Sequence, residues 1–168
     1  MLRILVVDDV DDILRCTERA LRQCRLLNPI HLIHDGEECI RYFEEMGTPA
    51  EEDGYLVFLD LIMPVSGLEV LRVISDKGLL RESILVMLSG VSDDAMIQEA
   101  YRLGAKSFLQ KPLMPGEVLE LLYSLQNKIL VEEKPDGLVL HWISTPIQRR
   151  SSDTEVVCRP GGVLTISV

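Results

Sequence analysis

Acidic residues come directly after two apolar, strand-like runs of the sequence. Asp8 and Asp9 follow the run at residues 3–7. Asp60 follows the run at residues 55–59. Because the carboxyl ends of parallel strands meet at one edge of a sheet, we expect these three carboxylates to converge. Their repulsion would raise at least one carboxyl pKa, and a divalent cation with oxygen ligands relieves it, so the pattern predicts a Mg2+ site.

Two hydrogen-bond donors follow two further apolar runs. Ser89 comes after residues 84–88, and Lys111 comes after residues 107–110. Both should lie at the same edge of the sheet as the acidic residues. A hydroxyl group and an ammonium group suit anionic oxygens, so the combined set favours a phosphoryl group held between Mg2+ and the lysine.

Strand-like and helix-like segments alternate along the first three quarters of the chain. The strands of this alternating pattern would position the polar residues. The expected strands are residues 3–7, 30–34, 55–59, 84–88 and 107–110. The expected helices run from residue 13 to near residue 28 and over 37–46, 67–74, 93–103 and 115–129. Five such βα units predict an α/β fold with a doubly wound parallel sheet, covered by helices on both faces.

The polar set, in this order and at these strand ends, resembles the response-regulator receiver domain of two-component signalling, the CheY-like family. The resemblance covers residues 1–129 and implies a flavodoxin-like (βα)5 sheet with strand order 2-1-3-4-5. The residues that carry it are Asp8, Asp9, Asp60, Met63, Pro64, Gly67, Ser89, Gly90, Phe108, Lys111 and Pro112.

The resemblance implies a role for each residue of the metal site. Asp60 would be the phosphoacceptor and a metal ligand, Asp9 a direct ligand, and Asp8 a ligand acting mainly through water. Ile62 would contribute only its backbone carbonyl group to Mg2+. The loop after the phosphoacceptor would contain Met63, Pro64 and Gly67.

The resemblance also implies a switch. Lys111 would pair with the phosphoryl oxygens, Ser89 would move to bond one of them, and Phe108 would swing into the vacated space. The sequence departs from the commoner family pattern at Ser89, where threonine is frequent. Ile62 and Val91 occupy positions that influence how water reaches the acyl phosphate, and apolar side chains cannot orient water.

The resulting expectation is a signalling protein and not an enzyme. Its phosphoryl group would come from a histidine kinase or phosphotransfer protein, and its output would be binding to a downstream protein, with a homodimer left open. A phosphatase with an aspartate nucleophile would need a second acidic residue where Ile62 stands. A flavodoxin-like cofactor binder would need a glycine- or hydroxyl-rich phosphate loop, which the loops after the expected strands at residues 3–7 and 55–59 lack.

Charge and composition narrow the class further. The formal net charge of −10 disfavours direct binding to nucleic acid, and no apolar run is long enough to span a membrane. We therefore expect a cytoplasmic protein without membrane contact. Cysteines 16, 24, 39 and 158 lack the spacing of metal ligands or disulfides and are expected to be buried free thiols.

Residues 130–168 form a C-terminal extension that matches no recognised output domain. Strand-like runs at 138–143, 155–158 and 163–168 favour a β-rich extension that could be a β-hairpin. Fewer than ~40 residues rarely fold alone, so we expect the extension to pack on the receiver, a second copy or a partner. A partly disordered tail is the alternative left open at this point.

Overall fold

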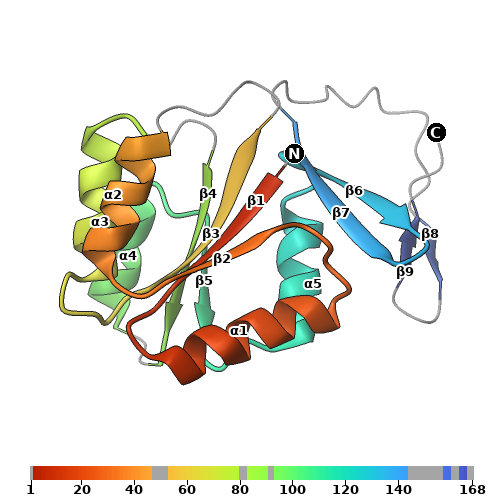
Figure 1. Ribbon diagram of the computed structural model, residues 1–168, viewed down its shortest axis with the longest axis horizontal. Helices are drawn as coiled ribbons and strands as arrows, with labels where there is room; N and C mark the ends of the chain where they lie inside the picture. The colour runs from red at the N-terminus through yellow and green to blue at the C-terminus, as the bar shows by residue number, and fades with distance from the viewer. Residues whose placement is uncertain are drawn as a thin grey trace.

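The computed structural model describes residues 2–46, 53–79, 83–90 and 93–143, and the backbone of residues 157–159 and 163–165. Its centre is a five-stranded parallel sheet in the order β2-β1-β3-β4-β5 (Figure 1). This confirms the doubly wound α/β fold. The strands are β1 (Leu2–Val7), β2 (Ile30–Ile33), β3 (Gly54–Asp60), β4 (Ser83–Ser89) and β5 (Ser107–Gln110).

Five helices cover the two faces of this sheet. Helices α1 and α5 lie on one side, and α2, α3 and α4 lie on the other (Figure 1). Their bounds are α1 (Asp11–Gln23), α2 (Gly36–Met46), α3 (Gly67–Asp76), α4 (Asp94–Arg102) and α5 (Pro115–Ser124). None of these described helices is long and apolar enough to cross a membrane.

Each face of the sheet has its own hydrophobic core because successive side chains of a strand point to opposite faces. In β1, Ile4 and Val6 join the core beneath α1 and α5, whereas Leu5 and Val7 join the core beneath the other three helices. Strands β3 and β4 are buried along their whole length, as continuous apolar runs predict for central parallel strands.

The expected fifth helix is too long. Helix α5 ends at Ser124, a turn follows, and Ile129 is the first residue of strand β6 (Ile129–Lys134). Ile129 is nevertheless buried in the same core as α5. The apolar residues keep a helical spacing beyond Ser124 because the turn returns the chain to the same core. The spacing alone therefore could not show that the helix ends at Ser124.

The first helix also ends earlier than expected, at Gln23. Arg25 has a φ angle of 58°, in the left-handed region that commonly ends helices. The expectation for the thiols is correct for Cys24 and Cys39, which are buried, and wrong for Cys16, which is exposed. The side chain of Cys158 lies outside the described residues.

The C-terminal extension is β-rich, as expected. Strands β6 and β7 (Gly137–Trp142) form an antiparallel hairpin beside the main sheet (Figure 1). Further along the chain, β8 (Val157–Arg159) pairs with β9 (Val163–Thr165).

Candidate phosphorylation and metal site

Asp8, Asp9 and Asp60 meet at the carboxyl edge of the sheet, where sequence reasoning placed them. Asp8 follows β1 and Asp60 ends β3, and these two strands are hydrogen-bonded neighbours. One carboxylate oxygen from each of the three residues lies within 4.8 Å of the other two. Asp8 and Asp60 are buried and Asp9 is exposed, so the cluster opens to solvent on the Asp9 side.

Lys111 enters this cluster from the end of β5. Its ammonium group lies 2.8 Å from Asp60 Oδ1 and also contacts Asp8 Oδ2. Its backbone N–H donates to the Ser89 carbonyl group at 2.8 Å, which ties the lysine to the end of β4. Three carboxylates and one ammonium group leave a formal charge of −2 among these four residues.

Burial raises the pKa of the Asp60 carboxyl group. The hydrogen bond and the positive charge of Lys111 lower this pKa, as does the backbone N–H of Ile62, and the charge of Asp8 raises it. Since the net direction is upward, the groups present compensate only part of the cost of burying an ionised Asp60. Additional positive charge would favour the ionised carboxylate.

The residues fit a divalent cation. The close carboxylate oxygens are the ligands that Mg2+ prefers, and the residual charge of −2 matches a single divalent ion. A pocket of about 430 Å³ gives access to this site. Its lining residues are Asp8, Asp9, Val10, Ile13, Asp60, Ile62, Gly90 and Lys111.

The loop after Asp60 is held close to the acidic site by a glycine. A Cβ atom on Gly67 would lie 2.1 Å from the Asp60 carbonyl oxygen, so a larger residue would displace the backbone at this point. The Gly67 N–H donates to Leu61 O at 3.1 Å. Met63 is buried in the core beneath α2 and α3, whereas Pro64 is exposed at the surface.

The two expected switch residues lie on neighbouring strands. Ser89 is fully buried at the end of β4. Phe108 is half-buried in β5, opposite Met87, and packs against the core beneath α4. Val91, expected to affect hydrolysis of the acyl phosphate, lies outside the described residues.

Sequence reasoning singled out Ile62 and missed the other apolar residues at the rim of the pocket, Val10 and Ile13. Val10 and Ile62 line the opening and are 49% and 53% exposed, respectively. Ile13 lines it from the first turn of α1. The available signal was an apolar residue directly after the acidic pair, where a polar helix cap is usual.

Comparisons with known proteins point to one family. A family model described as the response regulator receiver domain matches residues 4–123. The chain is 31% identical over 106 residues to transcriptional regulatory protein GlnL of Bacillus subtilis, covering 62% of this chain and 31% of GlnL. It is 28% identical over 123 residues to chemotaxis protein CheY of Listeria monocytogenes, covering 73% of this chain and 96% of that protein.

Two of the relatives are much longer than the matched region. The chain spans only about a third of GlnL and of protein-glutamate methylesterase/protein-glutamine glutaminase 3 of Geobacter sulfurreducens.

Among solved structures, bacteriophytochrome response regulator RtBRR is 28% identical with a TM-score of 0.66, covering 80% of this chain and 84% of RtBRR. Bacteriophytochrome response regulator AtBRR is 30% identical with a TM-score of 0.62, covering 75% of this chain and 94% of AtBRR.

Proposed function

This chain belongs to the family of response regulator receiver domains, and we propose that Asp60 is its phosphoacceptor in a Mg2+-dependent phosphorelay reaction. The observation that carries the proposal is the contact of buried Asp60 with Lys111, beside the carboxylates of Asp8 and Asp9. The proposal is supported by one open pocket that is lined by the carboxylates of Asp8, Asp9 and Asp60 and by the side chain of Lys111. The individual metal ligands remain predictions. Asp9 and Asp60 would bind Mg2+ directly, Asp8 would bind it through water, and Ile62 would contribute its backbone carbonyl group.

In the proposed reaction an oxygen of ionised Asp60 attacks the phosphorus atom of a phosphohistidine on a kinase or phosphotransfer protein. A P–O bond forms, the P–N bond breaks, and its electron pair returns to the imidazole of the donor. The Lys111 ammonium group, now shared by two carboxylates, would pair with a phosphoryl oxygen. Bound Mg2+ would supply stabilisation of the negative charge on the transferring group.

The test of the proposal is the intact mass of the chain after incubation with acetyl phosphate, with and without Mg2+. We expect the wild-type chain to gain one phosphoryl group only when Mg2+ is present. Asp60→Asn keeps the shape of the side chain, removes the nucleophilic oxygen, and should show no gain. A phosphorylated Asp60→Asn chain would place the acceptor elsewhere.

The proposed output is a change in protein binding. Phosphorylation would draw Ser89 toward the phosphoryl group and Phe108 inward, altering the surface formed by α4 and β5. The partners would be a histidine kinase or phosphotransfer protein and a downstream protein target, in the cytoplasm. A homodimer is a further candidate for the binding-competent form.

We expect the acyl phosphate on Asp60 to be long-lived. Ile62 is half-exposed at the rim of the pocket and has no group that could orient an attacking water. Ile62→Asn adds a donor and an acceptor at this rim, so the rate of phosphate loss should rise roughly 10-fold, less than the roughly 100-fold or more that a fully positioned acid or base contributes. The measurement is the decay of phosphorylated mass after removal of acetyl phosphate. Ile62→Val is the matched control, and equal decay in both variants would mean that water positioning does not limit hydrolysis.

A further inference from the structure

The hairpin β6–β7 follows the matched family region and is amphipathic. One face bears Ile129, Val131, Leu138, Leu140 and Trp142, all of which join the core shared by α1, α5 and β1. Its other face bears Leu130, Glu132 and His141, and there the His141 ring contacts Glu132 at 2.9 Å. The apolar face is therefore already covered by this chain itself.

The connection between α1 and β2 pairs with β7 like an additional strand. Leu27 N–H donates to Leu138 O at 2.9 Å, and Leu138 N–H donates to Arg25 O at 2.8 Å. Strand β7 thus lies between β6 and residues 25–28. Gly137 makes this approach possible, because a Cβ atom there would lie 2.2 Å from the Arg25 carbonyl oxygen.

The fully buried side chain of Asn28 links the hairpin to the main sheet. Its amide nitrogen donates to Leu2 O at 2.7 Å and to Leu140 O at 2.8 Å. Its amide oxygen accepts from Leu140 N–H at 2.7 Å. Every hydrogen of this amide is used, and only an amide can serve two carbonyl groups and one N–H from this position.

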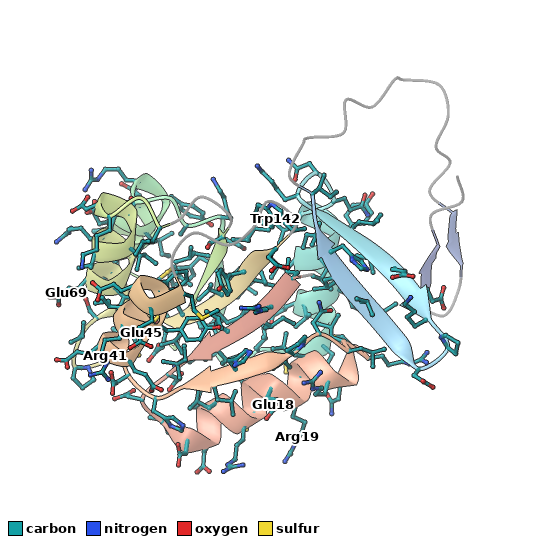
Figure 2. The ribbon with its side chains drawn as sticks, turned by 45° about the horizontal axis from the view of Figure 1, so that its top comes forward. Glu18, Arg19, Arg41, Glu45, Glu69 and Trp142 are labelled. Carbon is teal, nitrogen blue, oxygen red and sulfur yellow. The ribbon has the colours of Figure 1, made fainter. Side chains whose placement is uncertain are left out.

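Trp142 closes the contact at the start of β3. A Cβ atom on Gly54 would lie 2.5 Å from the indole ring, so the ring lies directly against the Gly54 backbone. Figure 2 shows Trp142 where the hairpin meets the sheet. The contacts at Leu2 and Gly54 are at the amino ends of β1 and β3, about 20 Å from Asp8 and Asp60 at the opposite ends.

We propose that the hairpin is an intramolecular part of the receiver fold, docked on residues 25–28 with Asn28 as its positioning residue. The folding unit of this chain then extends to Trp142, beyond the matched family region that ends at residue 123. The candidate phosphorylation site lies at the other end of the strands, so we expect it to form independently of this contact.

Trp142 is the only tryptophan of the chain and reports the docking directly. In urea, the full chain should show one transition at which tryptophan emission and far-UV circular dichroism change together. Asn28→Asp turns a donor toward Leu2 O and Leu140 O into a repelling carboxylate, and we expect its melting temperature to fall by roughly 5–15 °C. Gly137→Ala should produce a loss in the same direction by blocking the approach to Arg25.

Gly116→Ala is the matched control, because a Cβ atom there meets nothing within 4 Å, and its melting temperature should not fall. Acetyl phosphate should still phosphorylate each folded variant. A Gly137→Ala chain that fails to fold beside a folded control would also support the proposal.

Three results would overturn the proposal. The first is a tryptophan transition at lower urea than the circular dichroism transition. The second is a melting temperature of Asn28→Asp and of Gly137→Ala that equals the melting temperature of the Gly116→Ala control. The third is a dimer by sedimentation that becomes a monomer in Asn28→Asp and Gly137→Ala, since the hairpin would then dock on a second copy.

Discussion

Asp9→Ala should lower the rate of Mg2+-dependent phosphorylation by acetyl phosphate at least about 100-fold, the scale of losing one strong electrostatic contact to a transition state. The fold should survive. Asp9 is exposed, so its removal leaves no buried group unpaired and reduces repulsion among the three carboxylates. Without Mg2+, the melting temperature of the variant should equal or exceed that of the wild-type chain.

The same variant separates metal binding from chemistry. Mg2+ should raise the melting temperature of the wild-type chain, because a ligand that binds only the folded state stabilises it, and should have little effect on Asp9→Ala. Asp12→Ala is the matched control, since Asp12 is also an exposed acidic residue of the same segment but lies outside the three-carboxylate cluster. Equal phosphorylation in wild type and Asp9→Ala would contradict the assignment of Asp9 as a metal ligand.

The convergence of the acidic residues could be predicted because it depends only on strand direction. Asp8 and Asp60 each end an apolar run, and parallel neighbours must bring such ends together. The sharing of Lys111 between both carboxylates could not be predicted. It depends on where the end of β5 lies relative to β1 and β3, and that position is set by the packing of the whole sheet.

The hairpin is a clearer example of a contact that local sequence patterns cannot predict. An apolar run near residue 138 predicted a strand, and β7 is present. Its docking depends on Asn28, which stands before a proline and has the pattern of an ordinary turn residue. The backbone groups of Leu140 that bind the Asn28 side chain are 112 residues away along the sequence, so no local sequence pattern connects the two residues.

Lys111→Met should cause the largest loss of stability of any single change considered at the site. The lysine contacts two buried carboxylates, and removal of one partner from a buried ion pair typically costs about 3–5 kcal/mol. For a chain of this size, that corresponds to roughly 6–20 °C in melting temperature. Lys106→Met, which removes an exposed lysine, is the control and should change the melting temperature little.

The loss should depend on pH in a defined direction. Burial already raises the pKa of Asp60 above its usual value of 3.8, and the charge and hydrogen bond of Lys111 oppose this rise. Without Lys111 the folded pKa rises further, so the folded chain binds a proton more readily than the unfolded chain. The deficit should be complete above that raised pKa, shrink as the pH falls through it, and lose its Asp60 component below the folded pKa of Asp60 in the wild-type chain, which itself lies above 3.8.

A second substitution tests whether charge is the cause. Asp60→Asn in the Lys111→Met background removes one of the two carboxylates that lost their partner, so part of the melting temperature should return at pH 7. The measurement is a double-mutant cycle by thermal unfolding without Mg2+, repeated between pH 4 and pH 8. A deficit that stays constant over this range, with no recovery in the double variant, would mean that Lys111 stabilises the fold through packing of its aliphatic chain and not by neutralising Asp8 and Asp60.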